Sequence, residues 1–372
     1  MDNTYEDLSL PNRVLLGPGP SNVPDRVMKA LSSPVVGHLD PAFLAVMEEV
    51  QEMLRSVFMT ANQFTIPVSG TGSAGMEAAL VNSIEEGDNV LVCVNGVFGE
   101  RMCDIVERCG GILRRVDTKW GTSIDPEQVL KALEEFPADI VTIVHAETST
   151  GVLQPLEEIS KITHEKDALL VVDAVTSLGG APLKVDEWEI DVCYSGTQKC
   201  LSCPPGLAPV TFSPRAVEKL EKRSQKVQSW YLDMTMIRKY WGSDRVYHHT
   251  APISMIYALR ESLRIVLEEG LVKRWERHQK LHRNLVAGLG NLGLKMLVDE
   301  KFRTPMLNSV IIPSGADDAL IRKRLLDEYN TEIGSGLGPL KGKIWRIGLM
   351  GHSCTQENVD YILSALKSLL SQ

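Results

Sequence analysis

Residues 168–180, ALLVVDAVTSLGG, contain the most apolar strand-like run of the chain, and Asp173 ends it. A continuous apolar run of this kind is typical of a strand that is covered on both faces, as in a parallel sheet. Similar runs occur before and after it, and segments with helical period separate most of them. These runs cover residues 89–94, 111–116, 139–144, 191–195 and 208–213. The alternation predicts an α/β fold in which helices cover a mostly parallel sheet.

The pattern changes after about Pro252. Two long helical segments lead into short strand-like pieces, and a helix at 357–370 closes the chain. With 372 residues the chain is longer than one compact core usually supports. We therefore predict an arm at residues 1–20, a large domain at 21–270 and a smaller α+β domain at 271–372.

Two segments near the start of the chain have clear local signatures. Residues 41–58 place apolar side chains on one face, so we predict an amphipathic helix that packs on the core. Residues 15–24, LLGPGPSNVP, are too rich in glycine and proline to form a helix. We expect them to form an extended arm that enters the large domain and narrows the substrate pocket.

The bulk composition disfavours several classes of protein. The chain is 44% hydrophobic and 23% charged, and its net charge of −9 disfavours binding to nucleic acid or to an anionic membrane. No apolar run approaches the ~20 residues needed to span a bilayer. The first residues, MDNTYEDLSLPNR, are too acidic and polar for a secretory signal or a transit peptide. We therefore predict a cytoplasmic protein.

The seven cysteines are odd in number and scattered through apolar runs, which is typical of reduced, buried thiols. Cys200 and Cys203 form a C-x-x-C pair. No second pair at metal-ligand spacing accompanies them, and prolines follow where a redox motif would open a helix. We interpret both cysteines as packing residues.

A phosphate cradle is predicted where an apolar run ends in Ser69-Gly70-Thr71-Gly72-Ser73 and a strong helical segment follows. Small residues let the backbone approach a ligand closely, and the start of a helix presents free N–H groups to an anion. The glycines also fit the G-x-G-x-x-G pattern of a dinucleotide site. That site needs an acidic residue at the end of the next strand, where this chain has Asn95-Gly96. An NAD-dependent dehydrogenase therefore remains only a weak alternative.

Lys199 lies 26 positions after Asp173, one strand further along and at the same predicted edge of the sheet. A phosphate cradle, an aspartate and a lysine at successive strand ends match what pyridoxal phosphate requires. The lysine amine condenses with the aldehyde, and the aspartate keeps the ring nitrogen protonated. A partly desolvated site would lower the pKa of Lys199 from its usual value of about 10.4, so that the freed amine can move the substrate Cα proton.

Several longer motifs occur in a familiar order. They read GPGPSNVP, SGTGSAGMEAALVN, VNGVFGER, HAETSTGVLQPL, VVDAVTSLGG, YSGTQKCLSCPPG, VYHHTAPISMIYALRESL and WRIGLMG. Through them, nearly the whole chain resembles the alanine–glyoxylate and serine–pyruvate aminotransferases of class V, which are fold type I pyridoxal-phosphate enzymes.

The resemblance implies roles for the residues at the strand ends. Lys199 would hold the cofactor covalently, and Asp173 would pair with its pyridine nitrogen. Phe98 would stack on the ring, although an ordinary core aromatic is the alternative. Thr148 would donate a hydrogen bond to the 3′ oxygen. The phosphate would be held by Thr71, Gly72, Ser73 and Gln198.

Three further residues complete the implied site. Tyr247 and Thr250 match residues that reach the phosphate of the neighbouring subunit, so a homodimer with shared active sites is expected. His248 and His249 lie between them, but no other ligand has suitable spacing, and we predict no metal. Arg346 matches the residue that grips the substrate α-carboxylate, because its planar guanidinium can bind both oxygens at once.

We predict a pyridoxal-phosphate-dependent aminotransferase that moves an amino group from a small amino acid, alanine or serine, to glyoxylate or pyruvate. Ser73 and Thr197 differ from the residues common in animal members, so ureidoglycine or 3-hydroxykynurenine remain alternative donors. A lyase or cysteine desulfurase of the same fold is less favoured, because Cys200 and Cys203 crowd the lysine and do not sit on a separate loop.

Overall fold

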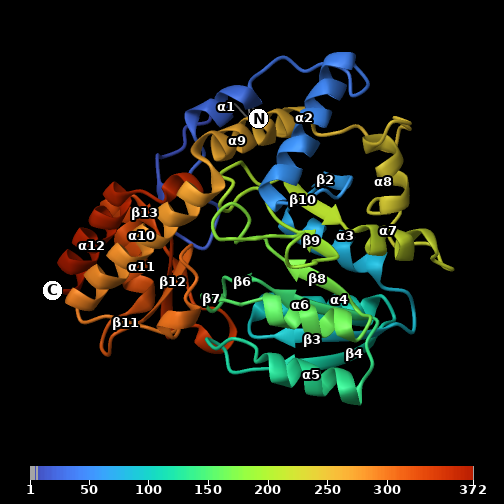
Figure 1. Ribbon diagram of the computed structural model, residues 1–372. Coiled ribbons are helices and arrows are strands. Elements are labelled where there is room, and N and C mark those ends of the chain that lie inside the picture. The colour runs from blue at the N-terminus through green and yellow to red at the C-terminus, as the bar shows by residue number, and fades with distance from the viewer. Residues whose placement is uncertain (1–4, 6, 372) are drawn as a thin grey trace.

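The computed structural model describes residue 5 and residues 7–371, and a seven-stranded sheet forms its centre (Figure 1). The strand order is β2 (Phe64–Ser69), β10 (Leu207–Phe212), β9 (Val192–Tyr194), β8 (Leu169–Asp173), β5 (Ile140–Val144), β3 (Asn89–Val94) and β4 (Ile112–Asp117). Neighbouring strands are parallel except where β10 is involved. The prediction of an α/β fold with a mostly parallel sheet is confirmed.

Strand β10 is the exception because the loop that joins it to β9, residues 195–206, contains no crossover helix, which a parallel neighbour would need. This loop carries Lys199. Strand β2 is antiparallel to β10 in turn, so it runs in the same direction as β9. The carboxyl ends of β2, β3, β5, β8 and β9 therefore lie along one edge of the sheet, where ligands bind in such folds.

Helices pack against this sheet and against each other (Figure 1). Those from the first 270 residues are α1 (Asp25–Leu31), α2 (Pro41–Phe58), α3 (Gly72–Ser83), α4 (Val97–Arg108), α5 (Pro126–Glu135), α6 (Glu157–Glu165), α7 (Pro214–Glu221), α8 (Met234–Trp241) and α9 (Ile253–Glu269). A short hairpin of β6 (Ala146–Glu147) and β7 (Val152–Leu153) follows β5.

The predicted amphipathic helix over 41–58 is confirmed as α2, and its ends follow from local chemistry. Asp40 caps the helix by accepting a hydrogen bond from the Ala42 amide at 2.8 Å, and Pro41 occupies the first turn, where it has no N–H to leave unpaired. The helix ends at Met59, which adopts a left-handed conformation with φ of 54°. The apolar face of α2, including Phe43, is buried in the main hydrophobic core.

The end of the chain forms a separate layer of sheet and helix, which lies at the left of Figure 1. Its antiparallel sheet has the order β11 (Lys295–Met296), β12 (Leu307–Ile311), β15 (Ile344–Gly348) and β14 (Gly334–Ser335). Its helices are α10 (Leu271–Asn291), α11 (Asp318–Tyr329) and α12 (Gln356–Leu370), with short 3-10 turns at Glu300–Phe302, Gly338–Leu340 and Gly351–Ser353. A second hydrophobic core, which includes Leu285, Trp345 and Ile362, lies between them. The domain division at residues 270 and 271 stays a prediction.

The amino-terminal arm pairs with the carboxyl-terminal layer, a contact that we did not predict. Strand β1 (Val14–Leu15) pairs in parallel with β13 (Thr331–Glu332), and Leu16 is buried in the second core. The Gly348 amide donates to the Leu16 carbonyl at 2.8 Å. The arm therefore binds to the carboxyl-terminal layer before the chain reaches the large sheet.

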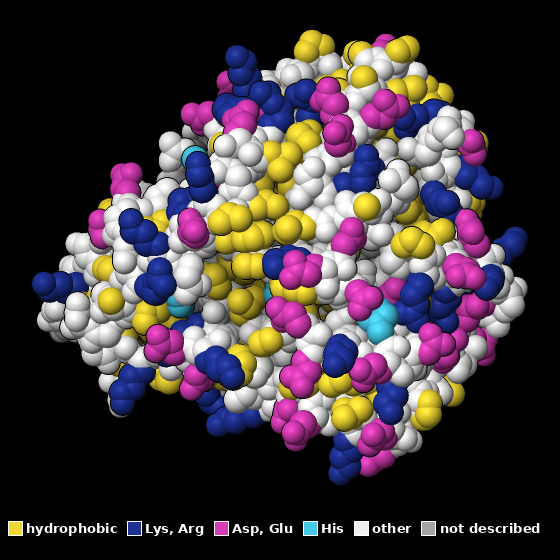
Figure 2. All heavy atoms as spheres, viewed as in Figure 1, with side chains coloured by type: hydrophobic (Ala, Val, Ile, Leu, Met, Phe, Trp, Pro, Cys, Tyr) yellow, Lys and Arg dark blue, Asp and Glu magenta, His cyan; other side chains and the backbone are white. Residues whose placement is uncertain are grey.

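Figure 2 shows the surface of the face seen in Figure 1. Apolar side chains gather near its middle, between the carboxyl-terminal layer and the large sheet, and charged side chains of both signs cover much of the rest. Within residue 5 and residues 7–371, none of the helices combines the length and the apolar character that crossing a membrane would demand.

Candidate active site

The predicted phosphate cradle forms at the junction of β2 and α3. Gly70 has a φ of 146°, and a Cβ at this position would lie 2.5 Å from the Cβ of Ala74, so only glycine fits without strain. Thr71 is the residue before the first turn of α3, and the amides at the start of a helix have no carbonyl partner within it. The turn therefore offers donors to an anion at the carboxyl edge of the sheet.

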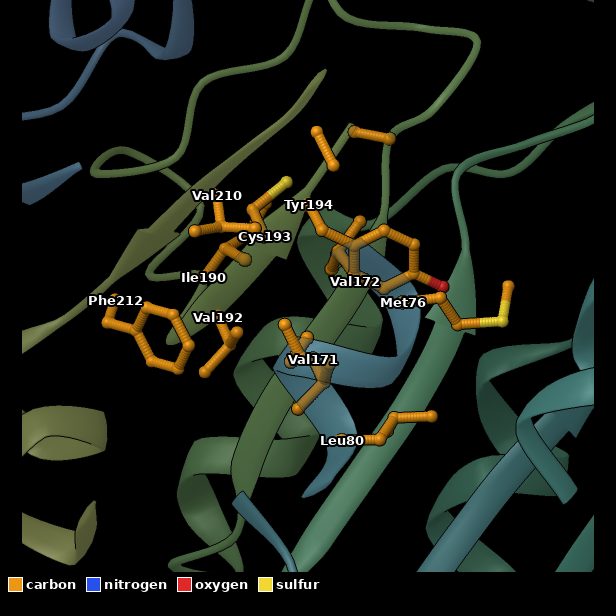
Figure 3. Packing of buried hydrophobic residues seen from close by; sticks show 14 of the residues in the cluster. Met76, Leu80, Val171, Val172, Ile190, Val192, Cys193, Tyr194, Val210 and Phe212 are labelled. Atoms are coloured by element: carbon orange, nitrogen blue, oxygen red, sulfur yellow. The ribbon is translucent and has the colours of Figure 1, made fainter. Parts of the chain in front are cut away.

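Helix α3 is held close to the sheet by small and apolar residues. A Cβ at Gly75 would lie 2.8 Å from the Cβ of Ala208, so the helix backbone rests directly on β10. Figure 3 shows Met76 and Leu80 of α3 packed over β8 and β9, with the ring of Tyr194 beside Met76. This packing fixes the position of the cradle relative to the strand ends.

A pocket of about 200 Å³ lies at the mouth of the cradle. Its walls include many of the residues predicted from the sequence: Thr71, Gly72, Ser73, Phe98, Asp173, Gln198 and Lys199. Three other lining residues, Met76, Arg101 and Val175, were not predicted. The Arg101 guanidinium lies 5.0 Å from the centre of the Phe98 ring. Its position three residues after Phe98 in α4 was the only signal in the sequence.

Asp173 is buried at the end of β8, and both of its oxygens accept hydrogen bonds. The Val175 amide donates to Oδ1 at 2.8 Å, and the Tyr194 hydroxyl donates to Oδ2 at 2.9 Å. Burial raises the pKa of Asp173 to about 7, and the two hydrogen bonds act in the opposite direction. The carboxylate therefore lies in a low-dielectric setting where a cationic ligand atom would stabilise its charge.

Lys199 lies in the loop after β9, and its amine donates to the Pro18 carbonyl. Burial lowers the pKa of Lys199 to about 8, and the positive charge of Arg346 adds to this effect. The arm holds the loop through Ser21, whose amide donates to the Gln198 carbonyl at 2.9 Å and whose hydroxyl donates to the Lys199 carbonyl at 2.7 Å.

The backbone of the arm packs closely against the Lys199 side chain at Gly19. Gly19 has a φ of 110°, and a Cβ at this position would lie 2.5 Å from the Lys199 Nζ. The contact between Pro18, Gly19 and Lys199 joins residues about 180 positions apart, so the sequence offered no signal for its geometry.

Arg346 comes from the carboxyl-terminal layer, in the middle of β15. Its Nε donates to the Ser335 carbonyl at 2.6 Å and its Nη1 to the Thr148 carbonyl at 3.0 Å. Its exposed fraction is 6%, and burial lowers the pKa of Arg346 to about 10 while the charge of Glu147 opposes this. Within residues 7–371 no carboxylate forms an ion pair with it, so its remaining N–H groups can donate to an anionic ligand.

Glu147 is a fully buried carboxylate that we did not predict. It accepts hydrogen bonds from the Phe98 amide at 3.2 Å, the Ser149 amide at 2.9 Å and the Ser149 hydroxyl at 2.6 Å. The Val97 amide donates to the Ser149 oxygen at 3.0 Å. Glu147 and Ser149 thus fix the turn that carries Phe98. The predicted residue between them, Thr148, is buried but is not among the residues that line the pocket.

Tyr247 and Thr250 are the two predicted residues that lie apart from the others. The side chain of Tyr247 is 56% exposed, and its ring lies 5.1 Å from that of His38. Neither residue lines the pocket of its own chain. Their neighbour His249 connects this segment to the cradle, because its Nε2 lies 2.9 Å from the Ser69 hydroxyl.

The cysteines and histidines form no site of their own. All seven cysteines are free and buried. Burial raises the pKa of Cys200 to about 11 and raises that of Cys203 further, so neither provides a thiolate at neutral pH. Across the positions that the structure describes, no group of three or more His, Cys, Asp or Glu side chains is arranged to hold a metal ion.

A larger hollow of about 660 Å³ lies between α9 and α10, but its central charges are already paired. Glu269 accepts hydrogen bonds from both Arg274 and Arg277. Arg274 also donates to the Cys200 carbonyl at 2.6 Å, so this ion cluster helps to fix the loop that carries Lys199.

The family model described as aminotransferase class-V matches residues 13–362. The chain belongs to the class V aminotransferases. The predicted resemblance is therefore confirmed.

Three similar proteins illustrate the family. The chain is 42% identical to the (S)-ureidoglycine–glyoxylate transaminase of Bacillus subtilis, with 98% of this chain and 92% of that protein covered. It is 41% identical to the alanine–glyoxylate aminotransferase of Rattus norvegicus, with 98% and 89% covered. The crystal structure of the alanine–glyoxylate aminotransferase from Nostoc sp. superposes with a TM-score of 0.98 at 50% identity and covers 100% of this chain and 99% of that one.

Class V aminotransferases are fold type I enzymes that use pyridoxal 5′-phosphate, so the predicted cofactor is confirmed and the dehydrogenase alternative loses its basis. The residues present fit this group. The amides at the start of α3 can donate to a phosphate, Asp173 can accept from a protonated ring nitrogen, and Lys199 supplies the amine that an aldehyde requires. These groups line one pocket. The substrates are an amino acid and a 2-oxo acid.

Proposed function

We propose that this aminotransferase moves the amino group of a small amino acid, alanine or serine, to glyoxylate or pyruvate. The observation that carries the proposal is the pocket that gathers the cradle, Asp173 and Lys199 beside the buried cation of Arg346. The names of the relatives support glyoxylate as the acceptor, because both the ureidoglycine and the alanine enzymes use it.

The roles of the individual residues follow from their settings. When bound, pyridoxal phosphate supplies an electron-accepting ring that weakens the Cα–H bond of the attached amino acid. The Gly70–Ser73 turn and Gln198 would hold its phosphate, Thr148 its 3′ oxygen and Phe98 its ring face. Asp173 would accept a hydrogen bond from the protonated ring nitrogen, because a buried carboxylate stabilises a cation at that atom.

Lys199 would serve as the base that moves the substrate proton. Its Nζ must be neutral to accept the Cα proton, and burial brings its pKa to about 8, close to a neutral working pH. The Pro18 carbonyl accepts one N–H of this amine, which would orient the nitrogen lone pair. In the first half-reaction the amine would take the proton from the substrate Cα and deliver it to the cofactor carbon, and in the second it would move a proton in the opposite direction.

Arg346 would bind the α-carboxylate that every donor and acceptor carries. Two of its donors are already satisfied by backbone carbonyls, which fix the guanidinium plane and leave the outer N–H groups for a carboxylate. The Gly19 backbone lies against Lys199, so the arm would favour compact substrate side chains.

A homodimer would complete the site. Tyr247 is exposed and lies outside the pocket of its own chain. Two other exposed aromatic residues, Trp230 and Tyr231, pack against His248 and His249, which follow it. We propose that Tyr247 and Thr250 reach the phosphate of the neighbouring subunit. The expected cytoplasmic location stays a prediction.

The donor and the acceptor can be identified with a matrix of purified-enzyme assays. Alanine, serine and (S)-ureidoglycine are each paired with glyoxylate, pyruvate and 2-oxoglutarate, and kcat/KM is measured for each pair. We expect alanine or serine with glyoxylate or pyruvate to give the highest value. A strong preference for ureidoglycine would favour the second candidate function, which the 42% identity to the Bacillus subtilis enzyme supports. A preference for 2-oxoglutarate would contradict the proposal.

The shared site can be tested by mixing two inactive variants. Lys199→Ala lacks the base, and the double variant Tyr247→Ala, Thr250→Ala lacks the contribution to the neighbour. After random reassortment, hybrid dimers contain one intact site, so about a quarter of the wild-type activity should return. A mixture that stays inactive although hybrid dimers form would contradict the sharing of residues between subunits.

A further inference from the structure

We propose that Tyr194 is a positioning residue whose hydroxyl keeps Asp173 ionised, and that it thereby controls protonation of the cofactor ring nitrogen. The inference rests on the proposed role of Asp173. It concerns a residue that the sequence presents only as part of an apolar strand, DVCYS, with no sign of a polar task.

The register of the sheet brings the two side chains together. Asp173 is the last residue of β8, and Tyr194 is the last residue of β9 and lies directly opposite it in the parallel pair. The Tyr194 hydroxyl donates to Oδ2 of Asp173 at 2.9 Å, while the Val175 amide donates to Oδ1 at 2.8 Å. Each oxygen therefore receives one donor from the protein and keeps acceptor capacity for a ligand in the pocket.

The tyrosine ring cannot turn away from this contact. Tyr194 is fully buried, and Figure 3 shows its ring beside Met76 of α3, with the hydroxyl at the far end. A Cβ at Gly75 would lie 3.5 Å from the Tyr194 Cβ, so the helix backbone also rests on the base of this side chain. This packing fixes the position of the hydroxyl. Within the described residues its one polar interaction is the hydrogen bond that it donates to Asp173.

The charges around Asp173 make this donor important. Burial and the nearby carboxylate of Glu147 favour the neutral acid, whereas Val175, Tyr194 and the cation of Lys199 favour the carboxylate. Two further titratable neighbours stay neutral. Burial raises the pKa of the Cys193 thiol, and burial lowers the pKa of His145, whose amide donates to the Asp173 carbonyl at 2.9 Å, to about 3. Burial also raises the pKa of Tyr194 well above its usual value, so its hydroxyl stays protonated and remains a donor.

The test compares wild type and Tyr194→Phe as holoenzymes. The substitution keeps the ring and removes one donor to Asp173. We expect the acid limb of the kcat profile to move upward by about one pH unit, because a hydrogen bond to a charged group is lost and the pKa of Asp173 rises. The visible absorbance of the bound cofactor should titrate with the same shift, and the cofactor dissociation constant should rise about tenfold.

Tyr240→Phe is the matched control. Tyr240 is also fully buried, and its hydroxyl donates to the His38 carbonyl at 3.1 Å, outside the pocket. Its removal should leave the pH profile and the cofactor spectrum unchanged. If the Tyr194 variant binds cofactor and both pH titrations match those of wild type, the inference is overturned.

A second measurement keeps the buried hydroxyl of Tyr194 in place. Site-specific 3-fluorotyrosine at position 194 keeps the packing and makes the hydroxyl a stronger donor, so the acid limb should move to lower pH. The same limb staying in place would also overturn the inference. Failure of the wild-type protein to bind pyridoxal phosphate would instead overturn the proposed function itself, so the two failures are distinguishable.

Discussion

The two cations of the site, Lys199 and Arg346, lie in regions that are built differently. The loop of Lys199 is bound on several sides by the protein, because Ser21, Arg274 and its own turn all satisfy backbone carbonyls from Gln198 to Cys200. Arg346 projects from a strand of the carboxyl-terminal layer, and its guanidinium donates to two carbonyls and, among residue 5 and residues 7–371, pairs with no carboxylate.

The two regions suit two kinds of ligand, a cofactor that stays bound and a substrate that exchanges. Along the edge of the large sheet, Asp173 and Lys199 already have protein partners that fix their positions. Such preorganisation suits a cofactor that stays bound throughout turnover. Arg346 keeps free donors in a buried setting, which suits a carboxylate that must bind and leave in each half-reaction.

The largest effect is expected at the lysine. Lys199→Ala removes the amine that we propose to hold the cofactor and to move the Cα proton, so turnover should fall by at least about a thousandfold. Stopped-flow absorbance of the first half-reaction is the measurement. A variant that still transaminates within tenfold of wild type would contradict the proposed roles, because the reaction would then not need Lys199.

Arg346→Lys should act on the substrate alone. The cation remains but the planar fork is lost, so KM for alanine should rise about a hundredfold while kcat changes by only a few fold. Cofactor affinity, measured by equilibrium dialysis, should match that of wild type. Loss of cofactor affinity in this variant would mean that the two regions are not independent.

Gly19→Ala should disturb the contact between the arm and the lysine. The new methyl group would lie 2.5 Å from the Lys199 Nζ, and the φ of 110° is unfavourable for alanine, so kcat/KM should fall about tenfold. Gly87→Ala is the control, because its φ of 91° is also unfavourable for alanine and no atom lies within 4 Å of the added Cβ. Equal losses of activity in both variants would assign the effect to backbone strain and not to the contact.

The smallest effect concerns pH. With its pKa near 8, Lys199 is protonated below pH 8 and mostly neutral above it, so the rate at which apoprotein combines with the cofactor should rise about fourfold between pH 7.5 and 9 and then level off. Rapid-mixing absorbance follows the reaction. A rate that keeps rising to about pH 10.5 would show that the apoprotein pocket does not lower the pKa of this lysine.

The sequence predicts one region of the site much better than the other. The turn at Gly70, Asp173 and Lys199 follow strands, and the carboxyl ends of such strands meet at one edge, so a local pattern was enough to bring them together. Arg346 was assigned only through the family motif WRIG. The direction of β10 was missed, because a loop without a crossover helix resembles any other irregular segment in a one-dimensional pattern.

Residues that hold other site residues in place could hardly be recognised from the sequence. Tyr194 reads as a strand residue, and its hydrogen bond to Asp173 depends on the register of two strands. Glu147 could have been noticed as an acid next to an apolar run, but its distant partner is the Phe98 amide, 49 positions earlier. Contacts of this kind depend on the tertiary structure, not on spacing.

The route of the arm limits how the two layers can move. Leu16 is bonded to Gly348 in one layer and Ser21 to the lysine loop in the other, and only four residues lie between them. A chain spans at most about 3.5 Å per residue, so the five steps from Leu16 to Ser21 limit the separation of these two anchor points to about 18 Å. We therefore expect substrate to enter through displacements within this limit, and we expect a shift of one layer to reach the amine of Lys199 through the arm.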